Sequence, residues 1–241
     1  MRKRKTIEMK KSKNSIIRLE EVWKIYHVGE VDVYALRGMN ADIKSGEFVA
    51  VMGPSGSGKS TSVNMIGCLD IPTKGKIFLD GKDISLMDES ELAQIRGKKI
   101  GFIFQQFNLI HTLTAAENVV LPIVFQGVDK ETRDERAKKL LEIVGLGDRI
   151  FHRPSELSGG QQQRVAIARA LANDPDVILA DEPTGNLDQK TGKEIMQLLK
   201  DLHNKGKTVI MVTHDANLAK TAERVIYLMD GKNVNKLTRN I

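Results

Sequence analysis

Residues 48–60 read Phe48-Val49-Ala50-Val51-Met52-Gly53-Pro54-Ser55-Gly56-Ser57-Gly58-Lys59-Ser60. The first five are a continuous apolar run, which is typical of a short strand buried on both faces. The next eight match G-x-x-x-x-G-K-[ST], and Thr61–Leu69 can continue as a helix. The glycines let successive N–H groups turn inward where a Cβ would obstruct them, and the helix N-terminus adds partial positive charge. The stretch therefore predicts a strand, a phosphate-binding loop and a helix.

The motif predicts roles for two polar side chains of this loop. Lys59 is expected to reach the β- and γ-phosphates of a nucleoside triphosphate, and the Ser60 hydroxyl to ligate Mg²⁺. The expected nucleotide-binding residues here are Gly53, Pro54, Ser55, Gly56, Ser57, Gly58, Lys59, Ser60 and Thr61.

A second buried run, Val177-Ile178-Leu179-Ala180, ends in two carboxylates, Asp181 and Glu182. At the tip of a strand neighbouring the first, Asp181 is placed to hold Mg²⁺. Glu182 points elsewhere because strand side chains alternate, so it is a candidate general base for an attacking water. Two acids capping a strand in solvent are the alternative, which the phosphate-binding loop disfavours.

The remaining periodicity predicts the fold class. A third buried run, Val209–Val212, follows a stretch with apolar residues at helical spacing between Ile195 and Leu202, which makes a βαβ unit and a parallel sheet. Ile16–Val22 and Tyr34–Ile43 read as strands. Residues 104–164 have helical periodicity and no buried-strand run. We predict an α/β P-loop NTPase core with a mostly parallel sheet (about 16–103 and 165–241), an N-terminal antiparallel β subdomain and an inserted helical subdomain (about 104–164).

Charge is concentrated at one end of the chain. The whole sequence carries 37 Lys+Arg and 31 Asp+Glu, a net +6, and residues 1–14 alone hold seven basic residues and one acidic residue, 7 − 1 = +6. The rest is neutral, so no nucleic-acid partner is expected. We predict a basic disordered tail over 1–15. The functional alternative is that this tail contacts anionic lipid headgroups. A single cysteine, Cys68, and no apolar run near the length of about 18 residues needed for a membrane span favour a cytoplasmic protein.

A second phosphate-binding pattern is Leu157-Ser158-Gly159-Gly160-Gln161-Gln162-Gln163-Arg164, which opens a helix. Ser158 suits an N-cap, and the glycines again expose N–H groups at a positive helix end. Because one loop already cradles the nucleotide, we expect Ser158, Gly159, Gly160 and Gln161 to bind the γ-phosphate of a nucleotide held by another copy.

These motifs together resemble the ATP-binding-cassette (ABC) ATPases of membrane transporters over residues 16–235. The stretches FQQFNLI, LADEPTGNLD and VTHD are most similar to the lipoprotein-release and macrolide-export branch (LolD- and MacB-like). The resemblance implies ATP and Mg²⁺, hydrolysis by a homodimer or paired cassette, an integral membrane permease as partner, and a location on the cytoplasmic face of the cell membrane. An FtsE-like cell-division ATPase is the alternative. DNA-repair and translation relatives are disfavoured, because Gly53 to Leu157 spans only about a hundred residues and each motif occurs once.

The resemblance also implies further site residues. Gln105 matches the glutamine that reaches Mg²⁺ and the attacking water, with the adjacent Gln106 leaving a one-residue ambiguity. His214 matches the histidine that contacts the γ-phosphate, and Asp188 the aspartate that crosses the dimer interface. Tyr26 matches the aromatic residue that stacks on adenine, whereas nearby Trp23 suits a packing role. The expected catalytic residues are Glu182, His214, Gln105 and Lys59, and the expected metal ligands are Ser60, Gln105 and Asp181.

Overall fold

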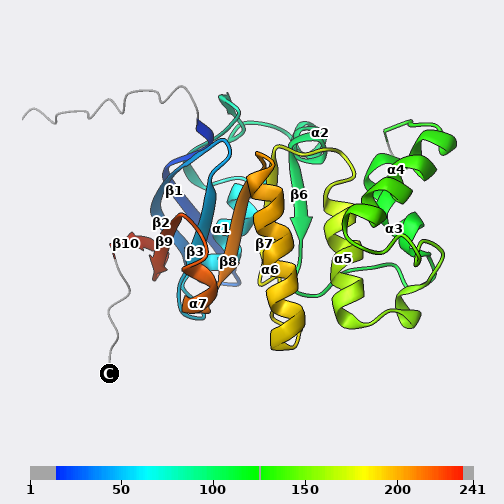
Figure 1. Ribbon diagram of the computed structural model, residues 1–241. Helices are drawn as coiled ribbons and strands as arrows, with labels where there is room; N and C mark the ends of the chain where they lie inside the picture. Colours follow the sequence, from blue (N-terminus) through cyan, green and yellow to red (C-terminus); the bar gives the residue numbers. More distant parts are fainter. Residues whose placement is uncertain (1–14, 125, 236–241) are drawn as a thin grey trace, which may run out of the picture.

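The computed structural model describes residues 15–124 and 126–235 (Figure 1). The basic tail predicted at the N-terminus lies outside these residues, apart from Ser15, which begins the first strand. Among residues 15–124 and 126–235, none of the helices combines the length and the apolar character that a membrane span requires.

The larger sheet has six strands, and its parallel part carries the functional loops. Its order is β10 (Lys232–Val234), β9 (Arg224–Met229), β3 (Phe48–Met52), β8 (Thr208–Thr213), β7 (Val177–Asp181) and β6 (Ile100–Ile103). All neighbouring pairs are parallel except β9 with β10. The mostly parallel sheet predicted from the three buried runs is confirmed.

Both faces of this sheet are covered, which explains the continuous apolar runs. Along β3, Phe48 and Ala50 pack into one core cluster, whereas Val49 and Val51 pack into the other. The first cluster joins the sheet to α3, α4, α5 and α6, and the second joins it to α1 and the antiparallel sheet. Neither face of β3 meets water, so no polar alternation is needed.

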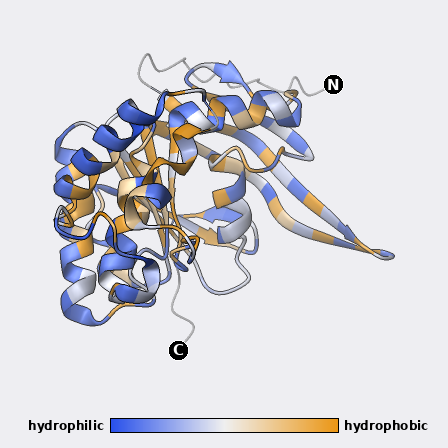
Figure 2. Ribbon diagram, turned by 90° about the vertical axis from the view of Figure 1, so that its right-hand side faces the viewer, coloured by the Kyte–Doolittle hydropathy of each residue, from blue (hydrophilic) through white to orange (hydrophobic). Residues whose placement is uncertain are grey.

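The smaller sheet is antiparallel, in the order β2 (Val31–Lys44), β1 (Ser15–Val28), β4 (Lys74–Leu79) and β5 (Lys82–Asp83). Strands β1 and β2 are longer than the sequence predicted. Beyond Trp23, β1 pairs only with β2, so backbone hydrogen bonds rather than burial hold the outer half of this hairpin. Figure 2 shows the hairpin projecting from the body of the protein with mixed hydropathy along it, which is why the apolar pattern did not reveal its length.

The helices lie on both sides of the larger sheet. They are α1 (Lys59–Ile66), α2 (Glu89–Lys99), α3 (Ala115–Val124), α4 (Lys130–Ile143), α5 (Gly159–Ala170), α6 (Gln189–Asn204) and α7 (Ala216–Ala219), with a 3-10 turn η1 (Pro154–Glu156). Helices α3, α4 and α5 pack together at the end opposite β1 and β2 (Figure 1). They fall in the segment for which an inserted helical subdomain is predicted. The predicted boundary at 164 falls inside α5, which also packs against β6.

Candidate nucleotide-binding and catalytic site

The loop between β3 and α1 has the close packing that its glycines allow. Gly58 caps α1 with φ 96°, and a Cβ there would lie 2.5 Å from the carbonyl oxygen of Ala35. A Cβ at Gly53 would lie 2.4 Å from the carbonyl oxygen of Leu228. Both positions therefore require glycine. The Lys59 ammonium donates hydrogen bonds to the carbonyl oxygens of Gly53 and Pro54, both at 2.8 Å, and so lies within the loop.

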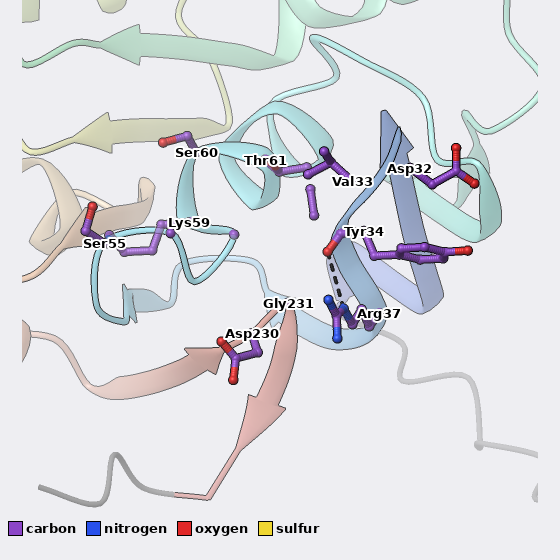
Figure 3. Close-up of a pocket in the computed structure, with 13 residues that line it drawn as sticks. Asp32, Val33, Tyr34, Arg37, Ser55, Lys59, Ser60, Thr61, Asp230 and Gly231 are labelled. Carbon is purple, nitrogen blue, oxygen red and sulfur yellow. Dashed lines mark hydrogen bonds between the residues drawn. The ribbon is translucent and has the colours of Figure 1, made fainter. Parts of the chain in front are cut away.

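A hollow of about 660 Å³ opens beside this loop (Figure 3). One wall comes from the loop and the start of α1, including Lys59, Ser60 and Thr61. The other wall comes from β2, including Val33 and Tyr34, and from the β9–β10 turn. Its volume is within the range of ligand-binding pockets. The sequence pattern predicts only a strand at Tyr34, because nothing local indicates that β2 folds back beside the loop.

The residue expected to stack on adenine, Tyr26, lies on β1 beside this hollow but does not line it. Tyr26 pairs with Val33 across β1 and β2, and directly opposite residues share a face of the sheet. Its hydroxyl lies 3.4 Å from Asp70 Oδ2, and the Lys24 ammonium lies 5.2 Å from its ring centre. Its role toward adenine stays a prediction.

Four predicted site elements gather at one edge of the parallel sheet. The phosphate-binding loop follows β3, Asp181 ends β7, His214 follows β8, and Gln105 lies two residues after β6. Because these strands are parallel, their carboxyl ends meet at the same edge, where ligands bind in open α/β sheets. One expectation was wrong: β7 is not adjacent to β3, because β8 lies between them.

Asp181 lies half-buried near charges of both signs. Burial and the neighbouring carboxylate of Glu182 raise its pKa above the ordinary value, and Lys59 partly opposes the shift. The donor groups expected for Mg²⁺ are the Ser60 hydroxyl, the Asp181 carboxylate and the Gln105 amide oxygen, all hard oxygen ligands of the type Mg²⁺ prefers. A cation beside Asp181 would oppose this shift in the same way as Lys59 does, by stabilising the ionised carboxylate against burial and the charge of Glu182, so these residues fit Mg²⁺. Among the described residues, no three His, Cys, Asp or Glu side chains form a metal cluster, so the set depends on the hydroxyl and the amide.

The direction of the Glu182 side chain comes from a turn, and the alternation expected from a continuing strand is wrong because β7 ends at Asp181. Glu182 follows the end of β7 with φ 48°, a left-handed conformation that is uncommon for a residue with a Cβ. Its N–H still donates to the carbonyl oxygen of Val212, at 2.9 Å. Its Oε1 lies 2.6 Å from His214 Nδ1, so the structure brings the two residues into direct contact. Strained conformations of this kind are concentrated at functional sites.

Gln105 lies against the loop that follows Glu182. A Cβ at Gly185 would lie 2.9 Å from Gln105 Nε2, so the glutamine side chain occupies that space. The Asn186 side-chain amide donates to the Gln105 carbonyl oxygen at 3.0 Å. These contacts place Gln105 beside the proposed catalytic loop.

Within their own chain, Ser158–Gln161 and Asp188 form the starts of two helices. Ser158 and Gln161 form a reciprocal capping box at the start of α5, and a Cβ at Gly160 would lie 2.3 Å from Thr191 Cγ2. The Asp188 carboxylate caps α6 by accepting hydrogen bonds from Lys190 and Thr191, which lower its pKa. The lining of the hollow beside the phosphate-binding loop includes none of Ser158, Gly159, Gly160, Gln161 and Asp188.

This fold and this arrangement of loops define a class of protein. Residues 36–185 match the family model described as ABC transporter, and the chain belongs to that family as an ATP-binding, ATP-hydrolysing subunit. Among its relatives, an ABC transporter ATP-binding protein of Thermotoga maritima is 56% identical over 217 residues, which cover 90% of this chain and 93% of that protein.

Two further relatives bear on assembly. The macrolide export ATP-binding/permease protein MacB of Brucella melitensis is 51% identical over 93% of this chain, which corresponds to 35% of MacB. The cassette MJ0796 of Methanocaldococcus jannaschii has a solved dimeric structure described as a post-hydrolysis state bound to ADP and Pi. It is similar with a TM-score of 0.83 and 55% identity, over 91% of this chain and 97% of that one.

Proposed function

We propose that two copies of this chain close around two ATP–Mg²⁺ and drive a membrane permease for export or lipoprotein release from the cytoplasmic face of the membrane. The proposal that two copies share each site rests on one observation: within a single chain, the two groups of phosphate-binding residues do not line the same hollow. Lys59, Ser60 and Thr61 line the hollow beside the phosphate-binding loop, whereas Ser158–Gln161 lie outside it. The dimeric structure of MJ0796 supports pairing of cassettes.

Each residue in the proposed mechanism has a defined task. The loop N–H groups and Lys59 hold the phosphates and stabilise charge on the transferring group, while Ser158–Gln161 of the other copy contact the γ-phosphate. Glu182 accepts the proton of the attacking water. The Nδ1–H of His214 donates to Glu182 and keeps that carboxylate oriented. A hydrogen bond from Nε2 to the γ-phosphate as well requires the ring to carry protons on both nitrogens. Mg²⁺ held by Ser60, Asp181 and Gln105 would supply charge neutralisation. Hydrolysis removes the phosphate that joins the copies, so the dimer opens.

The permease is proposed to dock in a groove of about 750 Å³ between α3 and α4. Its lining includes Val120, Leu121, Ile150 and Phe151, and Phe151 is 82% exposed. Helix α3 follows the segment that carries Gln105, so a docked cytoplasmic segment of the permease would be linked to the catalytic loop. The permease partner is supported by MacB, whose name joins an ATP-binding part to a permease part in one protein.

Mixing two inactive variants tests the shared site. Ser158→Arg places a cation at the start of α5 without altering the phosphate-binding loop, and Lys59→Ala removes the ammonium from that loop. In a heterodimer across a shared interface both defects fall on one composite site, and the other site is intact. Random pairing gives about half heterodimers, so the mixture should recover about a quarter of the wild-type ATPase rate. No recovery, with heterodimers shown by differential tags, would refute shared sites.

A further inference from the structure

Gln163 is a buried polar residue on α5 that joins three functional segments. Its side chain is fully buried. Its Nε2 donates to the carbonyl oxygen of Pro183 at 2.7 Å and lies 3.5 Å from the carbonyl oxygen of Phe104. Pro183 directly follows Glu182, and Phe104 directly precedes Gln105. One amide group therefore connects α5 to both proposed catalytic loops.

The Gln163 amide is only half satisfied at this position. Its Oε1 is buried and has no hydrogen-bond partner among the described residues. A buried acceptor without a partner destabilises a protein. The stabilising half of the side chain is its Nε2, and both acceptors that this nitrogen faces are backbone carbonyl oxygens of the two loops.

An exposed hydrogen bond also joins the same two loops. Asn186, in the loop after Glu182, donates to the Gln105 carbonyl oxygen at 3.0 Å, and Gln105 lies against Gly185. Gln163 thus holds the backbone of these loops from inside, and Asn186 holds it from outside.

We propose that Gln163 is a positioning residue that sets the distance between Gln105 and Glu182 and transmits movement of the start of α5 to both. This inference rests on the roles proposed above for Glu182 and Gln105. When the start of α5 meets the nucleotide of the other copy, a shift of the helix carries the Gln163 amide with it. Because that amide bonds backbone carbonyl oxygens, the shift moves the loops and not merely one side chain.

The test compares Gln163→Met with Gln162→Met. Gln162 lies on the same helix, but its amide donates to the carbonyl oxygens of Pro154 and Leu157, before the helix and away from the catalytic loops. Met removes the amide in both variants and keeps a similar volume. Gln163→Met should lower kcat by about 10- to 100-fold, as misplaced catalytic groups do. Its Kd for a fluorescent ATP analogue should stay within about twofold of the wild type, since the phosphate-binding loop is untouched. Gln162→Met should lower kcat much less than Gln163→Met does.

Two further measurements separate positioning from loss of structure. Asn186→Ala removes the exposed hydrogen bond without touching the core, so it should lower kcat while the melting temperature is unchanged. In the Gln105→Ala background, Gln163→Met should have less effect on kcat than in the wild type, because the two residues act through the same loop. Hydrogen exchange should speed up at residues 104–107 in Gln163→Met and not in Gln162→Met.

Three results would overturn the proposal: equal losses of kcat in the two methionine variants, a loss of ATP affinity that parallels the loss of kcat, or full additivity with Gln105→Ala. If Gln105→Ala alone left kcat unchanged, the role proposed for Gln105 would fail. The exchange of residues 104–107 and the effect of Asn186→Ala would then still report whether Gln163 holds this segment.

Discussion

Replacing Glu182 by Gln tests whether this carboxylate is the base or only a structural partner of His214. The change is nearly isosteric, and the amide oxygen still accepts a hydrogen bond from His214 Nδ1, which lies 2.6 Å from Glu182 Oε1 in the wild type. The amide cannot take a proton from water at neutral pH. Geometry is therefore retained while basicity is lost.

The structure predicts a large loss of rate and a small change in stability. Removing a positioned general base costs about 10²- to 10⁴-fold in rate. The His214 side chain is 71% exposed, against 16% for Glu182, so solvent screens the interaction between them. Such a contact contributes about 0.5–1 kcal/mol to folding at most. For a chain of this size, that amounts to a shift of about 1–4 °C in the melting temperature.

Steady-state ATPase assays, calorimetry and size-exclusion chromatography with ATP measure these effects. Glu182→Gln should lose turnover, melt within a few degrees of the wild type, keep its ATP affinity and accumulate an ATP-dependent dimer. Glu194→Gln is the matched control, because it neutralises a carboxylate on α6 that lies away from the hollow and is paired with Arg164 of α5. A rate loss below tenfold, or a variant that stays monomeric with ATP, would refute the reasoning.

Three further predictions follow from charge and exposure. Asp181→Asn should raise the melting temperature of the nucleotide-free protein at pH 7. Because the pKa of Asp181 is higher in the folded protein than its ordinary value of 3.8, folding stability falls as the pH rises from 3.8 through the pKa of the folded protein. Asn carries no ionisable group and so removes this loss of stability. The gain should shrink as pH falls toward 3.8, and a lower melting temperature at pH 7 would contradict it. Deleting residues 1–14 should leave ATPase activity intact and take the formal charge to 6 − 6 = 0. Full-length protein should then co-sediment with anionic vesicles more than the truncated form, and less so at high salt, whereas equal sedimentation would exclude lipid contact by the tail. Phe151→Asp should keep basal ATPase activity and abolish its stimulation by the permease, and full stimulation would exclude this groove as the docking site.

Local rules explain why much of the site could be predicted from the sequence. The phosphate-binding loop depends on contiguous residues, since the buried strand, the glycines and the helix start follow one another along the chain. Gly58 at φ 96° shows the conformational requirement that the motif predicts. The same holds for Ser158, whose helix cap involves a residue only three positions away.

Long-range packing decided what the sequence could not. The position of β8 between β3 and β7 depends on which strands pair, and all three runs are equally apolar. The placement of Val33 and Tyr34 beside the phosphate-binding loop depends on the path of the β1–β2 hairpin, which burial does not mark in its outer half.

The sequence by itself determined the phosphate-binding loop, the acidic strand end and the parallel core, because each depends on the period or spacing of neighbouring residues. Only the tertiary structure decided that Glu182 turns toward His214 and that Gln163 joins the loops carrying Gln105 and Glu182. Glu182 and His214 are 32 positions apart, and Gln163 and Pro183 are 20 positions apart. The geometry of both contacts depends on how the sheet and helices pack. Residue spacing along the chain carries no information about that packing.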